Sequence, residues 1–564
     1  MIFVKSALQF GYTVSNLRSK QIVGQFRNKL SPLFEKPDKF YSQRVPEFSG
    51  CRWSPKQNFL APESQNNSSS DILIGQFSFL NSKQDIGWPP DWSYNSSPKL
   101  WLYNLHYFEY LWCLDYSKSK TLVLDWIENY PLRRKQVGWE PYPTSLRLMN
   151  LCSVFFSKYR KQTEADTFFL KKLWSSIFIQ TEWLAKHLER HLLGNHLFEN
   201  VVALAFVGSC FSGRAAEKWL QLGKSILERE IPEQILGDGM HFERSPMYHC
   251  RITYLLAMLF NTGHQQLVDL VKKPLGKMIA ALGHLTHPDS RIALLNDSAF
   301  GIYNPPSQLE SYVRNLLNSN NSDLCNITKG PFALPEAGYY GFRDDEGTYI
   351  ICDAARIGPD YITGHAHADM FSFEMSLKGH RVIVDSGVHD YEVSPMRRYC
   401  RSTKAHNTVE IDGQDQCEMW AAFRVARRGR PHDVKWTPSE EGFQLSAWHD
   451  GYKRLKGSPV HHREFNWNKS GKLIIKDIIT ASKPQNIISR LHLHPNCKID
   501  QPKGNTARIA YLAGNIKITF SGDGELSLED SYYCPEFGVK IANKALGFSF
   551  LGSKIETEFQ IEAL

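Results

Sequence analysis

The chain has 564 residues, too many for one small hydrophobic core, so two or more domains are expected. Its 42% hydrophobic and 22% charged residues are typical of a soluble globular protein. The net charge of +8 allows an acidic ligand but is too weak for this length to indicate nucleic-acid binding. Aromatic residues reach 13%, which suits stacking on sugar rings, although core packing explains them at least as well.

The 11 cysteines are scattered and include no CxxC pair. This favours a reduced chain with buried thiols over a disulfide framework. Residues 1–20 lack a sustained apolar stretch followed by a small-residue cleavage site, so we expect no export signal and a soluble, cytoplasmic chain. We expect no transmembrane segment, because no apolar stretch approaches the length that crosses a bilayer.

The first part of the chain divides into an extension and a helical region. Residues 1–99 have no clear packing pattern and contain polar loops rich in proline, serine and asparagine at 63–70 and 88–98. Residues 100–301 read as helical, most clearly over 163–191, where Thr163 and Asp166 predict a capping-box start. Further helices are predicted at 144–158, 196–210, 214–229, 247–261 and 265–283. Successive antiparallel hairpins of this kind build a bundle, a solenoid or a closed α/α toroid, and the spacing alone does not choose among them.

The hydrophobic period changes to two in the second part of the chain. Residues 302–336, rich in proline and asparagine, look like an interdomain connection. From 337 to 564, short alternating runs such as GTYIICDAA and KLIIKDIIT are separated by turn residues, and we expect no helix between them. Antiparallel sheets stacked as a sandwich are the natural result. The predicted fold class is therefore α+β multidomain, an all-α domain followed by an all-β domain.

A histidine-rich motif opens the β domain. In GHAHAD, residues 364–369, two histidines and an aspartate occupy neighbouring positions, and a predicted hairpin follows. His367, together with Asp385 and with His406 of KAHNTV, forms a His/Asp/His set of the kind that binds zinc. Taken alone an H-x-H pair is a weak signal, and most such pairs bind no metal.

The strand geometry constrains this metal hypothesis. A two-residue turn at Lys378–Gly379 would place Asp385 opposite Ser372. His367 precedes Ser372 by five residues, about 17 Å at the rise of a strand. The GHAHAD segment must therefore curl back over the sheet if these residues share an ion.

Two motifs of the helical region carry polar side chains that could take part in catalysis. HLLGNHLFENVVAL places Asn195 at the start of a helix, where a capping role is the simplest interpretation. In LGDGMHFERSPMYHC, Pro246 predicts a helix start, so that Tyr248 lies in the first turn near the positive end of the helix dipole. We expect this position, together with Arg244, to favour the phenolate of a side chain that normally titrates near 10.

Five motifs in a fixed order carry a resemblance to a known family. GNHLFEN, DGMHFERSPMYH, TGHAHADMFSFE, VIVDSG and RSTKAHNTV together resemble the heparinase II/III family of polysaccharide lyases. The resemblance is specific over about residues 100–430 and more diffuse toward the end. It implies an (α/α) toroid followed by an antiparallel β-sandwich, and a carbon–oxygen lyase that cleaves uronate-containing polysaccharides by β-elimination.

The resemblance also implies roles for individual residues. Asn195 matches the residue that neutralises the substrate carboxylate, Tyr248 the base that is often also the acid, and His365 a histidine that assists as acid or base. His367, Asp385 and His406 match zinc ligands found in part of the family, where the metal is structural. Supporting or substrate-binding roles fall to His196, Glu199, Glu243, Arg244 and Arg401.

The chemistry of elimination explains why these residue types are needed. Removal of the C5 proton builds negative charge on the uronate carboxylate, which an amide such as Asn195 can meet without titrating. A base must reach C5 and an acid must protonate O4. Because Tyr248 and His365 come from different domains, we expect the site in the cleft between them. The aromatic-rich segments around Trp139, Glu140, Tyr142 and Trp420 are candidates for its walls, with burial in the core an equal alternative.

Two other functions remain open at this point. A glycoside hydrolase on an α/α toroid would need two carboxylates facing across the cleft, whereas the motifs offer Tyr, His and Asn. A glycan-binding or envelope-polysaccharide biosynthesis protein with lost or altered activity fits the expected lack of a leader, and the family-based location would then be the periplasm or cell envelope. The uronate, its linkage and sulfation, the endo or exo mode and the oligomeric state are not predicted.

Overall fold

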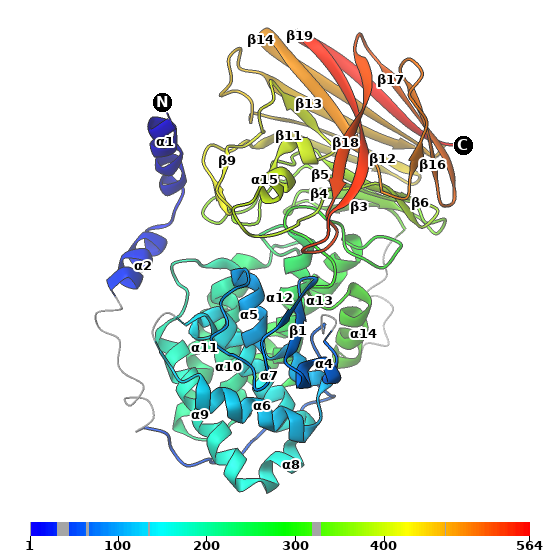
Figure 1. The fold of residues 1–564 in the computed structure, drawn as a ribbon. Helices are drawn as coiled ribbons and strands as arrows, with labels where there is room; N and C mark the ends of the chain where they lie inside the picture. Colours follow the sequence, from blue (N-terminus) through cyan, green and yellow to red (C-terminus); the bar gives the residue numbers. More distant parts are fainter. Residues whose placement is uncertain (1, 31–43, 64–66, 134–135, 318–328, 469) are drawn as a thin grey trace.

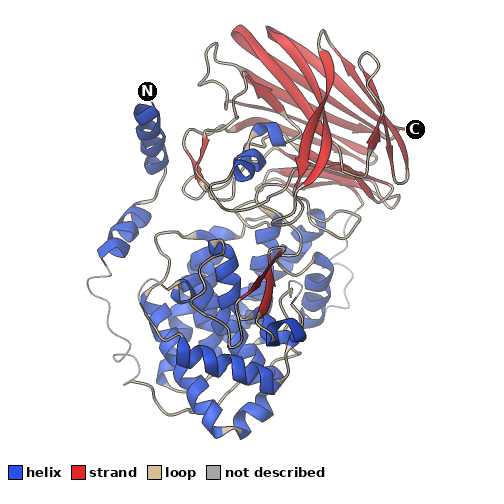
Figure 2. Cartoon of the chain, viewed as in Figure 1, coloured by secondary structure: helices blue, strands red, loops and turns tan. Residues whose placement is uncertain are grey.

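The computed structural model describes residues 2–30, 44–63, 67–133, 136–317, 329–468 and 470–564. A helical domain and a β domain lie against each other, and two N-terminal helices run alongside them (Figure 1). The colouring by secondary structure shows how cleanly the helices and strands are segregated (Figure 2). The predicted order, helical domain first and antiparallel β domain second, is confirmed.

Helices that follow one another along the chain pack together in the helical domain. Its helices are α5 (Lys99–Tyr107), α6 (Tyr116–Asn129), α7 (Pro141–Ser153), α8 (Arg160–Ala165), α9 (Thr167–Lys186), α10 (Gly194–Cys210), α11 (Arg214–Gln234), α12 (Pro246–Asn261), α13 (Gln265–His284) and α14 (Pro306–Leu317). Helix α10 packs on α11 in this way, and α12 packs on α13. Helices α10 and α12 are apolar on nearly all sides and almost entirely buried, which is the pattern of central helices. Among the described residues no helix is both long and apolar enough to cross a bilayer.

The structure corrects the predicted start of the helix expected at 163–191. Thr163 lies inside the short helix α8 and donates its hydroxyl proton to the carbonyl of Tyr159. Asp166 is the N-cap residue of α9, because its side chain accepts the backbone N–H of Phe169 at 3.1 Å. The apolar stripe continues past this break, so the hydrophobic period did not reveal it. Helix α14 lies within the 302–336 segment that was expected to connect the domains.

The β domain consists mainly of two antiparallel sheets. The smaller has the order β3 (Gly330–Leu334), β4 (Tyr339–Arg343), β5 (Tyr349–Asp353), β6 (Phe373–Leu377), β7 (His380–Ile383). The larger runs β11 (Pro431–Ser439), β12 (Gly442–His449), β13 (Val460–Asn468), β14 (Lys472–His492), β19 (Ile541–Ala563), β17 (Gly514–Ser521), β16 (Thr506–Tyr511), β15 (Lys498–Ile499). β18 (Glu525–Tyr533) pairs with β19, and β8 (Val409–Ile411) pairs with β14.

The smaller sheet is the middle layer of the molecule. One face packs on the larger sheet, with the rings of Phe373 and Phe465 5.7 Å apart. The other face packs on the helical domain through a separate apolar cluster that includes Tyr349, Ile351 and Leu285. Burial on both faces explains why β6 reads as a continuous buried run rather than an alternating one. Residues at the ends of these strands are therefore held between the two domains.

Two expectations about the β domain are wrong. A short helix, α15 (Pro395–Arg401), interrupts the strands, capped by the Ser394 hydroxyl, which accepts the N–H of Arg397 at 2.9 Å. Its seven residues are too few to give a helical period in the sequence. The β6–β7 hairpin also contains a bulge: Ser376 pairs with Arg381 but Met375 pairs with Ile383. The bulge moves β7 one residue out of the register that would place Asp385 opposite Ser372.

The N-terminal residues touch both domains. Helix α1 (Ile2–Ser15) lies beside the short hairpin of β9 (Met419–Trp420) and β10 (Arg424–Val425), where the Trp420 indole N–H donates to the Thr13 hydroxyl at 3.1 Å. Helix α2 (Ser19–Leu30) reaches the helical domain: Arg18, just before it, pairs with Glu233 of α11 at 2.5 Å. The extension thus runs along the outside of the boundary between the domains (Figure 1).

Replacement of Gly223 with alanine should destabilise the helical domain. A Cβ at this position of α11 would lie 2.6 Å from the Val201 carbonyl oxygen and 2.7 Å from the Ala205 nitrogen of α10. Backbone atoms cannot rotate away, so we expect a loss of about 1–3 kcal/mol in the free energy of unfolding, measured by urea denaturation. Gly11→Ala, in α1 with nothing within 4 Å of the new Cβ, is the matched control and should not lower stability. Equal stability of both variants would contradict the close packing of α10 and α11.

Candidate active site

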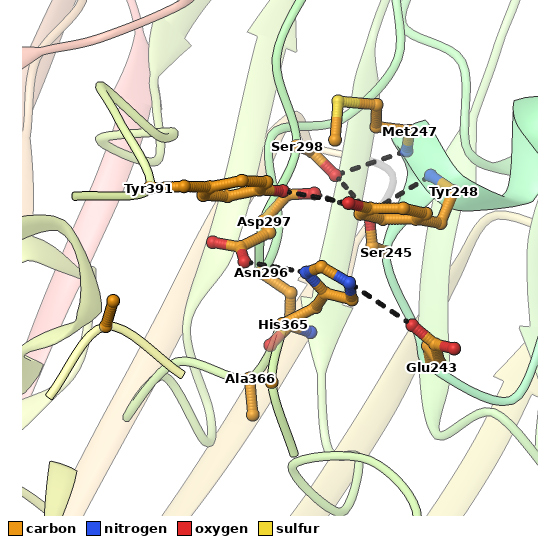
Figure 3. A network of polar contacts seen from close by, with 12 residues as sticks. Glu243, Ser245, Met247, Tyr248, Asn296, Asp297, Ser298, His365, Ala366 and Tyr391 are labelled. Atoms are coloured by element: carbon orange, nitrogen blue, oxygen red, sulfur yellow. Dashed lines mark hydrogen bonds and ion pairs between the residues drawn. The ribbon is translucent and has the colours of Figure 1, made fainter. Parts of the chain in front are cut away.

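Residues from both domains converge at one point. Tyr248 is the third residue of α12, whose predicted start at Pro246 is confirmed, and His365 lies in the loop that precedes β6. Their rings pack face to face at an angle, with centroids 4.0 Å apart (Figure 3). Asn195 of α10 completes the group, its side-chain amide 3.3 Å from His365 Nε2. The convergence expected of these three residues is therefore present in the structure.

Asn195 is not a capping residue. The N-cap position of α10 is Leu193, which makes no side-chain capping bond, and Asn195 follows within the first turn. The Asn195 side chain instead donates to Glu243, with Nδ2 3.0 Å from Oε2, and its backbone N–H donates to Oε1 at 2.9 Å. Glu243 thus fixes the direction of the amide, and its carboxylate also lies 3.6 Å from His365 Nε2.

Asp297 links the histidines of the GHAHAD motif. Its Oδ2 accepts from His365 Nδ1 and its Oδ1 from His367 Nε2, each at 2.9 Å. Arg397 binds the same carboxylate with both terminal nitrogens, one of them at 2.8 Å. Burial alone would raise the pKa of Asp297, but the charge of Arg397 and the three donors outweigh it and hold the pKa well below its usual value.

The ionised Asp297 sets the tautomers of both histidines. A carboxylate only accepts hydrogen bonds, so we assign the proton of His365 to Nδ1 and that of His367 to Nε2. His365 Nε2 faces the Asn195 amide at 3.3 Å and lies 3.6 Å from the Glu243 carboxylate, a contact that Figure 3 shows. His367 Nδ1 keeps its lone pair for another partner. One carboxylate thus orients two imidazoles for two different tasks.

Tyr248 does not have the environment predicted for it. Its pKa is raised well above 10, first by burial and then by the neighbouring phenol of Tyr391, whose hydroxyl lies 3.2 Å away. Arg244 does not oppose this effect, because its guanidinium donates to backbone carbonyls, among them that of Ala337 at 2.8 Å. The expectation that Arg244 favours a phenolate is therefore wrong: Tyr248 is held neutral in the protein without substrate.

The remaining predicted residues surround this centre without joining it. His196 Nδ1 is 3.0 Å from Glu189, and burial disfavours its protonation but Glu189 outweighs that and raises the pKa. Glu199 forms a buried ion pair with Arg251 at 2.7 Å. Arg401 donates to the carbonyl of Ala366, between the two histidines of the motif, at 3.0 Å. These contacts support the elements that carry the site.

Three residues of the site were not predicted: Asp297, Tyr391 and Arg397. Tyr391 belongs to a loop of the β domain, and its ring also packs on Phe537 with centroids 4.9 Å apart. A cavity of about 400 Å³ is lined in part by Phe537, by Tyr303 and by Met247, which precedes Tyr248. No local pattern marks these residues, because each acquires its partners only when distant segments meet.

A second polar group lies next to the candidate active site. His367, Asp385 and His406 are fully buried and offer ligand atoms that all lie within 4.8 Å of one another, so they form a possible metal-binding group. His406 Nδ1 is bonded to Asp385 at 2.7 Å, which leaves Nε2 with no partner among the described residues; His367 Nδ1 is equally without one. Unpartnered buried nitrogens are costly unless a ligand meets them, so this set fits a metal ion. Asp369, whose Oδ2 is likewise unpartnered, was not part of the predicted set.

The GHAHAD loop folds back over the sheet, as the metal-binding group requires. Phe371 adopts a left-handed conformation with φ of 65°, and the N–H of Ser372 donates to the Asp369 carbonyl at 2.8 Å. Before this turn the loop is fastened to the helical domain, since the His367 N–H donates to Asn296 Oδ1 at 3.0 Å. The loop thus folds back before β6 begins, which removes the separation of an extended strand.

Replacing Asp297 with asparagine should destabilise the protein strongly. Arg397 would remain buried opposite a neutral amide, which costs about 3–5 kcal/mol when one partner of a buried ion pair is removed. Because the folded pKa is lowered, the carboxylate stabilises the fold above about pH 4, its usual range, and loses this effect as the pH falls toward the folded pKa. The difference in unfolding free energy from the unsubstituted protein should therefore shrink in acid.

The control for this prediction is Asp530→Asn, whose side chain is 87% exposed and should not alter denaturation measurably. An Asp297→Asn protein as stable as the unsubstituted one near neutral pH would contradict the central position given to this carboxylate.

Comparisons with known proteins cover most of the chain. The family model of the heparinase II/III N-terminus matches residues 115–319, and that of the heparinase II/III-like C-terminal domain matches residues 326–562. A heparin-sulfate lyase of Pedobacter heparinus is 28% identical over 352 residues, 57% of this chain and 51% of the relative. One of Bacteroides stercoris is 24% identical over 404 residues, 66% of this chain and 54% of the relative. The chain thus spans about half the length of the curated relatives it matches.

Solved structures share the fold. A crystal structure of heparinase III superposes with a TM-score of 0.72 at 17% identity, over 93% of this chain and 88% of that one. The heparan sulfate lyase HepC from Pedobacter heparinus gives 0.59 at 20% identity, over 93% and 87%. With both halves matched in sequence and the two-domain fold shared, the chain belongs to the heparinase II/III-like family.

Proposed function

We propose that this protein is a lyase that cleaves a uronate-containing glycosaminoglycan by β-elimination. The observation that carries the proposal is the meeting of Tyr248 and His365, from different domains, with ring centroids 4.0 Å apart and the Asn195 amide 3.3 Å from the imidazole. Relatives named as heparin-sulfate lyases support the substrate class. Elimination needs an amide donor, a proton acceptor and a proton donor, and the three residues supply one each.

In our proposal, Asn195 stabilises the carboxylate of the substrate. As the C5 proton leaves, negative charge spreads onto the uronate carboxylate, and N–H donors already in place stabilise it without reorganisation. Asn195 is buried and its amide is held by Glu243 on one side. In our proposal the N–H that faces His365 Nε2 in the free protein turns to the substrate carboxylate, which also releases the imidazole lone pair.

The two proton transfers are assigned from the positions of the groups and from the neutral state of Tyr248. Asp297 holds Nδ1 of His365 and leaves Nε2 facing Asn195, so we assign His365 as the group that removes the C5 proton. Tyr248 is held neutral by burial and by Tyr391, so we assign it as the acid that protonates O4 of the leaving sugar. This reverses the first assignment implied by the family motif. After each turnover His365 loses its extra proton to solvent and Tyr248 regains one from solvent, which restores both groups.

A hydrolase is a weaker candidate on this geometry. Hydrolysis needs two carboxyl groups free to face the bond. Asp297 is fully buried and engaged with Arg397, His365 and His367, while Glu243 is engaged with Asn195. A glycan-binding protein without activity is the other alternative, and it differs from our proposal in the product that is formed.

Incubation with a panel of uronate-containing glycosaminoglycans should yield an unsaturated product with new ultraviolet absorbance. Tyr248→Phe and His365→Gln should each lower kcat by about 10²–10⁴-fold, the usual contribution of an acid or base, with the folded state retained as judged by circular dichroism. Reducing ends that appear without the absorbance would show hydrolysis, and binding without either signal would show a glycan-binding protein.

Deuterium exchange at C5 should separate the two roles. In D₂O, Tyr248→Phe keeps the group that removes the proton and should still exchange C5 of the uncleaved polymer, as read by mass spectrometry. His365→Gln should not. Exchange by His365→Gln but not by Tyr248→Phe would restore the tyrosine as the base.

We further propose that the metal-binding group holds zinc in a structural role. Zn²⁺ favours neutral imidazole and carboxylate ligands, and burial lowers the pKa of His367 to about 3, which keeps that ring neutral. His367, Asp385 and His406 would hold the ion and so join the loop before β6, the residues just after β7 and the segment before β8. The ion would supply a cross-link, and the loop that it fastens is the one that carries His365.

Elemental analysis of the purified protein should find about one zinc per chain. Removal of the metal with a chelator should lower the melting temperature, and His406→Ala should lose both the metal and this sensitivity. A folded, metal-free preparation with an unchanged melting temperature would refute the zinc proposal while leaving the lyase proposal intact.

A further inference from the structure

The hairpin of β9 and β10 brings an exposed aromatic ring to the candidate active site. Phe423, in its turn, has 43% of its surface exposed, although its ring lies edge-on to that of His365 at 6.4 Å and to that of Tyr391 at 5.2 Å. A Cβ added at Gly364 would be 3.9 Å from Phe423, so the ring borders the backbone just before His365. A large apolar face that stays exposed beside buried polar groups is a typical platform for a ligand ring.

The turn that carries Phe423 is strained and firmly supported. Ala421 has φ of 50°, a left-handed conformation that costs energy for a residue with a Cβ. The buried guanidinium groups of Arg397 and Arg401 both donate to the Ala422 carbonyl, at 2.9 and 3.0 Å. Arg397 is the residue that also binds Asp297. The same arginine therefore fastens the hairpin turn and the carboxylate that orients His365.

An exposed arginine, Arg424, follows Phe423 directly in the hairpin. Arg424 is exposed, and no carboxylate lies within ion-pair distance of it among the residues that the structure describes. Its guanidinium lies 4.7 Å from the Trp420 ring, which holds it in place on the hairpin. Neighbouring Arg427 differs, since it is paired with Glu418 at 2.7 Å. Arg424 is thus available for an anionic group of a ligand.

We infer that the β9–β10 hairpin is a saccharide subsite, in which Phe423 stacks on the sugar ring next to the bond that is cleaved and Arg424 binds a carboxylate or sulfate of the same chain. The inference rests on the proposed function and deepens it, because it assigns a recognition element for an acidic polysaccharide. Apolar faces of sugar rings suit an aromatic platform, and a planar guanidinium suits carboxylate and sulfate oxygens. Helix α1 supports the subsite from outside, where the Thr13 hydroxyl donates to the Val425 carbonyl at 3.3 Å.

The test measures binding apart from turnover. Acidic oligosaccharides prepared from a heparan-type glycosaminoglycan are titrated calorimetrically into Tyr248→Phe protein and into the same protein with Phe423→Ala or Arg424→Ala added. We expect each added substitution to raise Kd about tenfold, and Arg424→Ala to reduce the salt dependence of binding. Phe423→Trp should retain the binding of the parent.

Matched controls are available on the far side of the helical domain. Phe168→Ala removes a ring that is 62% exposed, and Arg214→Ala removes an exposed arginine at the opposite end of α10 from Asn195. Neither should alter Kd. In the active protein, Phe423→Ala should raise KM while kcat stays near that of the unsubstituted enzyme, which a merely structural role would not produce.

The possible outcomes separate the two proposals. Unchanged Kd in both hairpin variants, or no oligosaccharide binding by the Tyr248→Phe protein, would overturn the subsite. If the unsubstituted enzyme forms unsaturated product and the variants bind as before, the lyase stands and the subsite falls. If binding depends on Phe423 but no elimination product forms, the subsite stands and the lyase falls.

Discussion

The buried carboxylate of Asp297 is the interaction on which the rest of the site depends. It comes from the helical domain and bonds His365, His367 and Arg397, all from the β domain, so it is also a bond between the domains. A single ionised group in this position is costly to bury and is tolerated because every oxygen lone pair is used. The same arrangement decides which nitrogen of each imidazole is free. Orientation of the catalytic group and attachment of the two domains are thus one set of hydrogen bonds.

The layered architecture explains how such a centre can be rigid. The smaller sheet is packed on both faces, and the loop bearing His365 and His367 leads directly into its strand β6. Opposite it, Asn195 and Tyr248 lie in the first turns of α10 and α12, the two most deeply buried helices. Side chains at the starts of buried elements have little freedom, which keeps donors and acceptors aligned before a substrate arrives.

The sequence predicted the parts of this arrangement that follow from period and motif. Helices expected at 196–210 and 247–261 are α10, Gly194–Cys210, and α12, Pro246–Asn261, because long apolar stripes specify buried helices well. The break at Asp166 and the bulge between Ser376 and Met375 were missed, since each leaves the apolar pattern intact. Asp297 and Arg397 could not be found, because a charge is recognised as buried only when its partner, here 100 residues away, is known. Tyr391 was missed because its partner Tyr248 is also distant along the chain. The predicted direction of the Tyr248 pKa shift was wrong because burial and Tyr391, which raise the pKa, are likewise not visible in the local sequence.

The N-terminal extension has a mechanical consequence. Helix α1 is attached to the β9–β10 hairpin, and the residues around the start of α2 are attached to the helical domain through Glu233. The smaller sheet already packs on the helical domain over one whole face, and the extension adds attachments at the outer edge of that interface. Arg18 and Gln21 also contact Tyr361 of the β domain, so this part of the extension bridges both domains. Removal of the extension would leave the outer edge without these contacts, and the angle between the domains would then rest on the sheet and the central hydrogen bonds alone.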